Sequence, residues 1–416
     1  MDMTDRASLV PATAAPAATA RAAGLAFTLP LGLLAASALL IRSTPALPDF
    51  LAPLRLYGPY LALGAALIVS LAFKRGRALF AVLTLLLAYA GFQLFLAQGL
   101  QGFPARTVYA ALWLFVPFNL ALLSVLPERG ALNAFGARRL ILLLIEVSAT
   151  VAILAGDYRQ VTGALYRPLL EGVALAPHFP QLGFAPIALA LVVTTGRAVT
   201  RAGTVEAAFA VALAAFAAAC NAIGALEPYG WFTAAGVILA AGVLHDSYRM
   251  AFHDELTGIP GRRALNERLM SLDDRYALAL VDVDHFKLFN DSWGHEVGDQ
   301  VLKLVASRLR RVGGGGRAYR YGGEEFVIVF PGLQLPAVHH HAEALRQDIE
   351  RYKFEIRARQ GDRRRGGGAE PQWASLTVSI GVAGANAPLP APDTVVAAAD
   401  EALYRAKNGG RNQVAL

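Results

Sequence analysis

Long apolar runs dominate the first 250 or so residues of the chain, whereas shorter apolar and polar segments alternate in the rest. A run of roughly 18–20 apolar residues can cross a bilayer as a helix, which satisfies its own backbone hydrogen bonds. Eight runs of this length or slightly shorter occur at 22–41, 58–73, 78–97, 107–126, 140–155, 182–195, 205–226 and 231–244. The pattern predicts a multi-pass α-helical membrane domain of about eight transmembrane helices over residues 22–244, preceded by a tail of residues 1–21.

The basic residues between these runs indicate an orientation. An even number of spans places both ends of the chain on one side of the membrane. With the N-terminus inside, the tail and inner loops hold ten Lys and Arg residues and the outer loops hold five. Because basic loops are hard to translocate, we expect both termini to be cytoplasmic.

Composition supports this division. Hydrophobic residues make up 55% of the chain and charged residues 17%, which excludes a disordered or purely cytosolic protein. Residues 1–253 carry 16 Lys and Arg against 10 Asp and Glu, whereas residues 254–416 carry 22 against 21. The net charge of +7 therefore belongs mainly to the membrane part and is no argument for nucleic-acid binding. The single cysteine, Cys220, lies in an apolar segment and predicts helix packing.

Two features of the membrane part each have a functional and a structural interpretation. Glu146 lies inside the fifth run, where an acid is costly and often functional. It is also only about 9 Å along a helix from Leu140, from where it could reach the inner headgroups. The loop Gly156–Gln181 is either an external ligand-binding surface or a connector. The membrane part contains no repeated unit, so nothing in the sequence positively supports a transporter.

The last run continues into a soluble domain. Trp231–Leu244 leads into His245–His253 without Pro or Gly, which predicts a helical stalk at residues 245–253 followed by a domain at 254–416. Residues 276–284 form an apolar run ending in acid, typical of a buried strand. Asp282 and Asp284 are two apart, so a strand would place both carboxylates on one face. Such oxygens suit Mg²⁺, although a structural role explains this pair equally well.

A second acidic element follows a predicted hairpin. Residues 318–330 are typical of two strands joined at Gly322-Gly323, where the favoured turn needs positive φ at both central positions. Glycines also let a phosphate approach the backbone. Glu324 and Glu325 come next, and two carboxylate clusters in one domain favour a metal site over surface charge.

Eight ordered motifs cover residues 252–412: DELTGIPGRR at 254–263, DVDHFK at 282–287, ND at 290–291, GH at 294–295, GD at 298–299, RYGGEEF at 320–326, TVSIG at 377–381 and ADEALYRAKNGGRN at 399–412. This part of the chain resembles the diguanylate cyclase (GGDEF) family. The resemblance implies an α/β (α+β), palm-like fold with a central, mostly antiparallel sheet flanked by helices. It also implies the condensation of two GTP into cyclic di-GMP with release of two pyrophosphates.

The resemblance implies a metal site and a guanine site. Asp282, the backbone carbonyl of Val283, and Glu324 match the family's Mg²⁺ ligands, and Glu325 shares in metal binding. Two Mg²⁺ ions per half-site would neutralise the triphosphate and activate the attacking 3′-hydroxyl, with Mn²⁺ as the alternative metal. Asn290 and Asp299 match the guanine contacts.

Phosphate contacts are implied as well. Lys407 and Arg411 are four apart, so on a helix they would share a face and clasp phosphate oxygens. The remaining phosphate contacts match the Phe286–Lys287 backbone, the Lys287 side chain, and the turn at Gly322 and Gly323. For Asp284 the resemblance implies one of two roles, either positioning the metal ligands or accepting a proton.

The sequence departs from the family pattern at a product-inhibition site often written Arg-x-x-Asp. Gly313 and Gly316 occupy those two places, so feedback by this route should be absent. A basic segment, Arg363–Arg365, predicts a solvated loop. The family further implies a homodimer in the bacterial inner membrane, with GTP and the lipid bilayer as partners, cyclic di-GMP effectors downstream and no nucleic acid.

Two alternatives remain beside an active cyclase under transmembrane sensory control. One is a catalytically silent membrane receptor that binds GTP or a partner, which the intact acidic and amide residues argue against. The other is a cyclase with a hybrid GMP–AMP product, which Asp299 disfavours because members of relaxed specificity tend to replace that acid.

Overall fold

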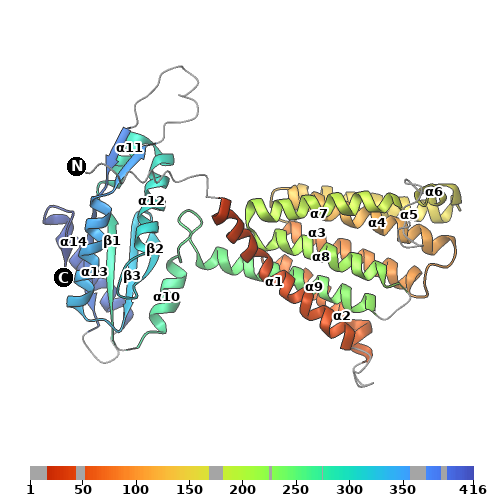
Figure 1. Cartoon of the computed structure of the whole chain (residues 1–416), viewed down its shortest axis with the longest axis horizontal. Coiled ribbons are helices and arrows are strands. Elements are labelled where there is room, and N and C mark those ends of the chain that lie inside the picture. The colour runs from red at the N-terminus through yellow and green to blue at the C-terminus, as the bar shows by residue number, and fades with distance from the viewer. Residues whose placement is uncertain are drawn as a thin grey trace, which may run out of the picture. The chain divides into compact units, whose positions relative to one another are not determined.

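The computed structural model describes residues 16–43, 52–167, 181–223, 227–273, 275–356, 372–385 and 391–416. The chain divides into two compact units, Met1–Ser247 and Tyr248–Leu416. Helices build the first unit, and a sheet flanked by helices builds the second (Figure 1). Both the Arg363–Arg365 loop and the second part of the Gly156–Gln181 loop lie outside the described residues.

Each of the eight apolar runs is helical over most of its described residues. The helices of the first unit are α1 (Pro16–Ser43), α2 (Ala52–Ala72), α3 (Gly76–Gly91) continued by the π-helix η3 (Phe92–Leu96), α4 (Gly102–Val125), α5 (Ala134–Ala155), α6 (Arg159–Leu165), α7 (Gln181–Arg201), α8 (Thr204–Asn221) and α9 (Glu227–Phe252). The predicted stalk, apart from His253, is part of α9, which runs without a break to Phe252.

Among the described residues, six helices are long and apolar enough to cross a membrane. They are α1, α3 with η3, α4, α7, α8 and α9. Helices α5 and α6 meet this criterion only as a pair bent by 119°, which would make seven. The apolar part of α2, Leu56–Ala72, is shorter. The expectation of about eight spans therefore stays a prediction for α2 and α5.

Helix α8 lies at the centre of the apolar core of the first unit. Its Phe209 and Phe216 are fully buried, and Cys220 is buried and free, as its surroundings in the sequence predict. Small residues bring the neighbouring helix close: a Cβ on Gly242 of α9 would lie 2.7 Å from the Cβ of Ala208. A larger side chain at position 208 would not fit this close contact.

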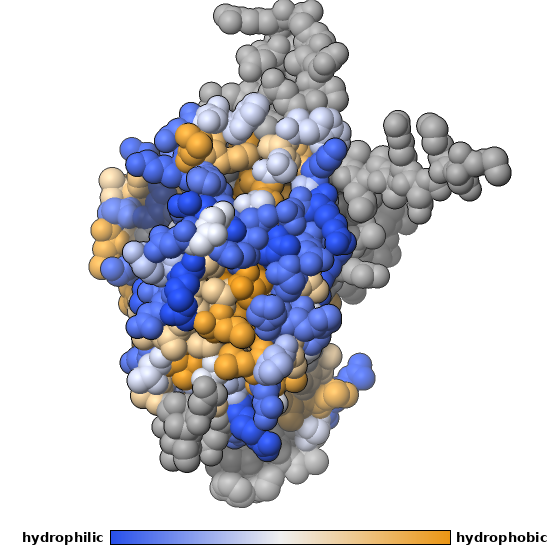
Figure 2. Space-filling model, turned by 90° about the vertical axis from the view of Figure 1, so that its left-hand side faces the viewer, coloured by the Kyte–Doolittle hydropathy of each residue, from blue (hydrophilic) through white to orange (hydrophobic). Residues whose placement is uncertain are grey.

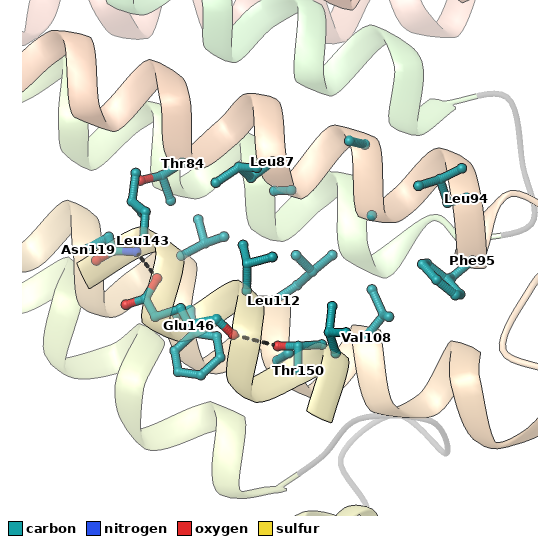
Figure 3. A pocket seen from close by; sticks show the side chains of 18 of the residues that line it. Thr84, Leu87, Leu94, Phe95, Val108, Leu112, Asn119, Leu143, Glu146 and Thr150 are labelled. Carbon is teal, nitrogen blue, oxygen red and sulfur yellow. Dashed lines mark hydrogen bonds between the residues drawn. The ribbon is translucent and has the colours of Figure 1, made fainter. Parts of the chain in front are cut away.

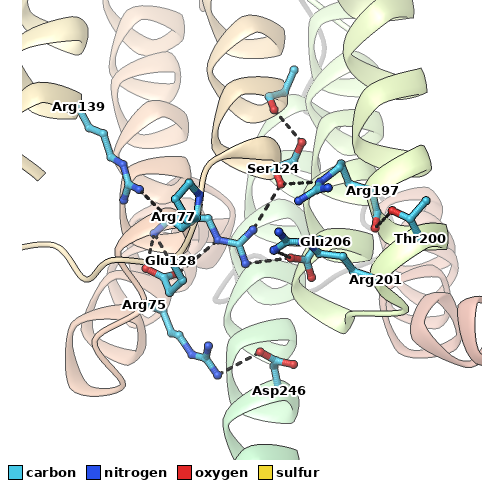
Figure 4. A network of polar contacts seen from close by, with 12 residues as sticks. Arg75, Arg77, Ser124, Glu128, Arg139, Arg197, Thr200, Arg201, Glu206 and Asp246 are labelled. Carbon is cyan, nitrogen blue, oxygen red and sulfur yellow. Dashed lines mark hydrogen bonds and ion pairs between the residues drawn. The ribbon is translucent and has the colours of Figure 1, made fainter. Parts of the chain in front are cut away.

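Charged side chains connect several helix ends of the first unit (Figure 4). The buried Arg77 of α3 donates from Nη2 to Glu206 Oε1 of α8 at 2.9 Å. Its Nε lies 3.5 Å from Glu128. Arg75 forms an ion pair of 3.0 Å with Asp246 of α9. Because buried charges are stable only when paired, this network fixes the relative positions of α3, α8 and α9.

The second unit contains the expected sheet. Its elements are α10 (Arg262–Met270), β1 (Tyr276–Val283), α11 (Phe286–Trp293), α12 (His295–Leu309), β2 (Arg317–Gly322), β3 (Glu325–Pro331), α13 (Leu335–Glu350), β4 (Lys353–Ile356), β5 (Gln372–Ser375), β6 (Val378–Gly384), α14 (Pro392–Asn408) and β7 (Val414–Ala415). The main sheet has the order β2-β3-β1-β6-β7 and is antiparallel apart from the β6–β7 pair. The α/β fold with a mostly antiparallel sheet is confirmed.

Strand β1 lies in the middle of this sheet and carries its core. Alternate residues face two apolar clusters, Ala279 and Val281 on the side of α12 and α13, and Leu278 and Leu280 on the side of α10 and α14. All eight of its residues are buried. The visible surface of this unit is mostly hydrophilic around an apolar area (Figure 2), as expected of a soluble domain.

Candidate active site

Asp282 is the first acidic residue of the site and lies at the end of β1. The strand register places it directly opposite Glu325 of β3 on one side and Ser379 of β6 on the other. Its side chain is buried and forms an ion pair with Lys407 Nζ of α14 at 2.9 Å. Burial raises the pKa of Asp282, and the ammonium of Lys407 opposes this rise.

The glycine turn differs by one residue from the expectation. Gly322 belongs to β2 and pairs with Glu325, so the two central turn residues are Gly323 and Glu324. Only Gly323 has a positive φ, of 26°. The expectation of positive φ at both glycines is wrong, because the strand pairing extends through Gly322. This register places Glu324 at the tip of the hairpin and Glu325 in β3.

The carboxylates of Asp282, Glu324 and Glu325 gather where β1 and β3 meet. Burial raises the pKa of Glu324, and repulsion from Asp282 and Glu325 raises it further, against the effect of Lys407. Like charges placed opposite each other in a sheet are destabilising, so this arrangement favours a bound cation.

The donor set fits a metal that arrives with a nucleotide. Within the described ranges, no three His, Cys, Asp or Glu side chains come close enough to form a metal centre on their own. Mg²⁺ is commonly held by one or two carboxylates and completed by water and substrate phosphates. Asp282, Glu324 and the carbonyl of Val283 match such a partial ligand set.

Asp284 has a different environment, since its carboxylate is fully engaged within the domain. It accepts hydrogen bonds from Thr377 Oγ1 and Ser379 Oγ, both at 2.7 Å, and from the backbone N–H of Asn412 at 3.1 Å. These bonds join β1 to β6 and to the segment before β7. They favour a positioning role for Asp284 over proton acceptance.

Lys407 and Arg411 do not share a helical face. Helix α14 ends at Asn408, and Arg411 follows two glycines with a left-handed φ of 64°. The expected four-residue helical spacing is therefore wrong, because Gly409 and Gly410 terminate the helix. The positive charge of Arg411 nevertheless counteracts the raised pKa of Asp282. Both cations thus act at the acidic cluster.

Asn290 and Asp299 come from neighbouring helices, α11 and α12. The Asn290 side-chain oxygen is buried and has no hydrogen-bond partner among the described residues. Gly298 makes room for it, because a Cβ at that position would lie 1.8 Å from Asn290 Oδ1. Asp299, the next residue, is exposed. An unpaired acceptor near an exposed carboxylate suits the donor-rich edge of a base.

The start of α11 forms the predicted turn beside β1. His285 adopts a left-handed φ of 56° and reverses the chain direction after the strand. Phe286 is buried in the domain core, whereas Lys287 is exposed. The buried ring anchors the turn, and the lysine is accessible to a ligand from solvent.

Residues 251–413 match the model of the family described as diguanylate cyclase, GGDEF domain. They form a GGDEF domain. Over 179 residues, the chain is 38% identical to diguanylate cyclase DgcP of Pseudomonas aeruginosa, covering 41% of this chain and 25% of that protein. Over 168 residues, it is 36% identical to diguanylate cyclase VdcA of Vibrio cholerae, covering 39% and 46%. The chain thus spans less than half of either relative.

A solved structure is also similar to the GGDEF domain. The crystal structure of the GGDEF domain of DgcB from Caulobacter crescentus, in complex with c-di-GMP, is 35% identical. The match covers 40% of this chain and 95% of the DgcB domain, with a TM-score of 0.35.

Sequence reasoning missed a connection between the start of the GGDEF domain and its glycine turn. Arg320 donates to Asp254 Oδ1 at 2.8 Å and to the carbonyl of Gly323 at 2.6 Å. Asp254 also accepts from the N–H and hydroxyl of Thr257, at 2.8 and 2.6 Å. Burial would raise the pKa of Asp254, but the hydrogen bonds from Thr257 and Arg320 lower it overall. Both residues lie in the motifs given above, but nothing in those motifs indicates that the two side chains form a pair.

The glycine run of the GGDEF domain leaves no room for the usual product-inhibition side chains. A Cβ on Gly313 would lie 2.9 Å from His341 Nδ1 of α13. A Cβ on Gly316 would lie 2.7 Å from the ring of Phe330. The His341 ring is nearly parallel to Phe330, with their centroids 6.4 Å apart. The imidazole of His341 therefore lies next to the position that the Cβ of an arginine at residue 313 would take.

Proposed function

We propose that the protein is a membrane-bound diguanylate cyclase that condenses two GTP into cyclic di-GMP and two pyrophosphates under the control of its N-terminal helices. The convergence of Asp282, Glu324 and Lys407 at the end of β1 carries this proposal. A cluster of carboxylates with a cation beside it suits a metal–triphosphate substrate. The relatives named as diguanylate cyclases support the choice of reaction.

The metal would be held by Asp282, the Val283 carbonyl and Glu324, with Glu325 adjoining. When bound, Mg²⁺ or Mn²⁺ supplies charge neutralisation of the triphosphate and lowers the pKa of the 3′-hydroxyl.

The chain's other residues bind and orient the nucleotide. The unpaired acceptor on Asn290 and the carboxylate of Asp299 would take N–H groups of guanine. Lys407 and Arg411 would hold phosphate oxygens, together with Lys287 and the α11 turn. Gly323 has no side chain and open space beside it, which leaves the backbone next to Glu324 accessible to a phosphate. Asp284 fixes β6 and the Asn412 segment behind these groups.

The active form is proposed to be a homodimer in the bacterial inner membrane, with both termini cytoplasmic. Each domain binds one GTP, and the product has two equivalent linkages, so two half-sites must face each other across a two-fold axis. A signal reaching α9 has a short route to the site. Asp254 follows Phe252 by two residues and bonds Arg320, which holds the glycine turn.

Product analysis tests the proposal. The purified full-length protein in lipid vesicles is incubated with GTP and Mg²⁺. The products are then separated, identified by mass spectrometry and quantified. We expect cyclic di-GMP and pyrophosphate in a 1:2 ratio, from the reaction's stoichiometry. GTP binding without turnover would instead identify the silent receptor, and a mixed product from GTP and ATP would identify a hybrid cyclase.

A further inference from the structure

An apolar pocket of about 290 Å³ lies between α3, α4 and α5 in the helical unit (Figure 3). Its polar lining residues are Thr84, Asn119, Glu146 and Thr150. The Thr84 hydroxyl donates to the Phe80 carbonyl at 2.8 Å, and the Thr150 hydroxyl donates to the Glu146 carbonyl at 2.9 Å. The threonine protons are thus used within their own helices. The carboxyl of Glu146 and the amide of Asn119 are left as the polar groups of the pocket.

Glu146 is 8% exposed, and only one of its oxygens has a partner among the described residues. Oε2 accepts a hydrogen bond from Asn119 Nδ2 of α4 at 2.7 Å. Oε1 is buried and makes no hydrogen bond there. The interpretation in which this side chain reaches the headgroups is wrong, because it is buried between helices. A buried oxygen without a partner costs free energy until a donor reaches it.

The lining supplies no positive charge to this carboxyl. No Lys, Arg or His is among the residues of the pocket that the structure describes. A lone carboxylate in apolar surroundings is strongly unfavourable, so the group either holds a proton or pairs with a cation. A cationic donor entering the pocket would satisfy the charge and Oε1 together.

The rim of the pocket is apolar and exposed. Leu94 of η3 is 77% exposed, and Val151 of α5 is 55% exposed. If these helices cross the bilayer as proposed, the opening faces acyl chains, and a ligand would enter with an apolar body. Glu146 also lies seven residues past Arg139, about 10 Å along the helix. The headgroup of a diacyl phospholipid, fixed at the interface, would not reach it.

We propose that this pocket binds a single-chain amphiphile whose head group is a primary amine. The ammonium donates to Glu146 Oε1 and balances its charge, while the chain lies between α3 and α5. The proposal goes beyond the cyclase reaction and gives the helical unit an input ligand. It rests on the proposed membrane placement, but not on catalytic activity.

Binding is measured on the full-length protein in vesicles of phosphatidylcholine, which carries no primary amine. Radiolabelled dodecylamine is titrated into wild type, Glu146→Gln and Leu144→Gln, and the saturable part of the uptake is compared. Glu146→Gln keeps the acceptor for Asn119 but removes the charge, and should weaken binding roughly tenfold or more. Leu144 is 55% exposed and lies outside the pocket, so its variant should bind like wild type.

A second variant and two further probes test the chemistry. Val147→Phe narrows the pocket and leaves the carboxyl in place, and it should also reduce the binding of dodecylamine. Dodecanol lacks the charge and dodecyltrimethylammonium lacks the donor, so both should compete at least tenfold less well. Equal competition by either one, or saturable binding that ignores both pocket variants, would overturn the proposal, as would no saturable binding.

The same titration separates this proposal from the cyclase proposal. A variant with Glu324→Ala and Glu325→Ala should bind dodecylamine as wild type does, because the acids that it lacks belong to the other compact unit. Loss of binding in Glu146→Gln with retained product formation would support the pocket independently of the reaction.

Discussion

At the residue scale, the site depends on carboxylates held for a ligand rather than for packing. Glu324 is half-buried at a hairpin tip and Glu325 is exposed. Replacing both with Ala should abolish cyclic di-GMP formation and leave the fold and membrane insertion intact, because neither side chain fills the core. Product assays, circular dichroism and vesicle flotation check this. Glu267→Ala, at an exposed position of α10, is the matched control. Wild-type product from the double variant would contradict the metal assignment.

Asp254 should contribute stability that depends on pH. Its pKa is lowered in the folded state, so its stabilisation is present above the ordinary Asp pKa of about 3.9 and is lost as pH falls through the folded value. Asp254→Asn should therefore lower the free energy of unfolding at pH 7 by about 2 kcal/mol, and with it the thermal midpoint. The difference in midpoint between wild type and variant should disappear below about pH 4. Thermal unfolding of both proteins across this range tests it. A gap that is constant with pH would assign the effect to packing.

The placement of the candidate site's residues could be predicted in part. Asp282 and Glu324 follow from acidic motifs placed at a strand end and a hairpin. The bond between Arg320 and Asp254 could not, because it joins residues 66 apart in the sequence, and their spacing carries no periodicity. The partner of Glu146 was equally hidden, because the contact between α4 and α5 that brings Asn119 to it depends on tertiary packing.

At the element scale, helix α12 shapes the proposed guanine site through one glycine. Gly298→Ala would put a Cβ 1.8 Å from Asn290 Oδ1, and the amide would have to move. We expect KM for GTP to rise roughly tenfold, since hydrogen bonds to the base are lost, while α12 itself gains helix propensity. Steady-state kinetics measure this. Ser307→Ala, on an exposed part of α12, should leave KM unchanged.

The turn between α12 and β2 predicts an enzyme without the usual product feedback. Gly313 and Gly316 provide no charge, and His341 and Phe330 occupy the space beside them. Adding cyclic di-GMP to initial-rate assays should give no non-competitive inhibition. Strong inhibition of that type would show that another surface has taken over the role.

Element boundaries show where local sequence signals end. The glycine pair predicted a hairpin correctly, but the pairing of Gly322 with Glu325 moved its turn by one residue. Similarly, Arg411 has the spacing of a helical neighbour of Lys407, yet two intervening glycines end α14 first. The pairing of two strands determined the first outcome, and two local glycines determined the second.

At the scale of the whole molecule, the apolar runs predicted the helices of the first unit, but their length alone does not decide how many cross a membrane. The GGDEF domain was predictable because its motifs are local. Its assembly is not, because the surface that joins two copies leaves no periodic pattern in one sequence.

The facing-half-site mechanism makes a prediction about mixtures. Glu324→Ala damages metal binding and Asn290→Ala damages guanine binding, so a mixed dimer has one defect in each half-site and no complete pair. Co-reconstituting the two variants in vesicles should therefore yield no more product than either alone. Mixing wild type with Glu324→Ala is the control, and its activity should fall below that of the same wild-type amount alone, because mixed dimers remove active subunits. Substantial activity in the two-variant mixture, or full activity from a protein shown to be monomeric during the assay, would exclude two half-sites facing each other.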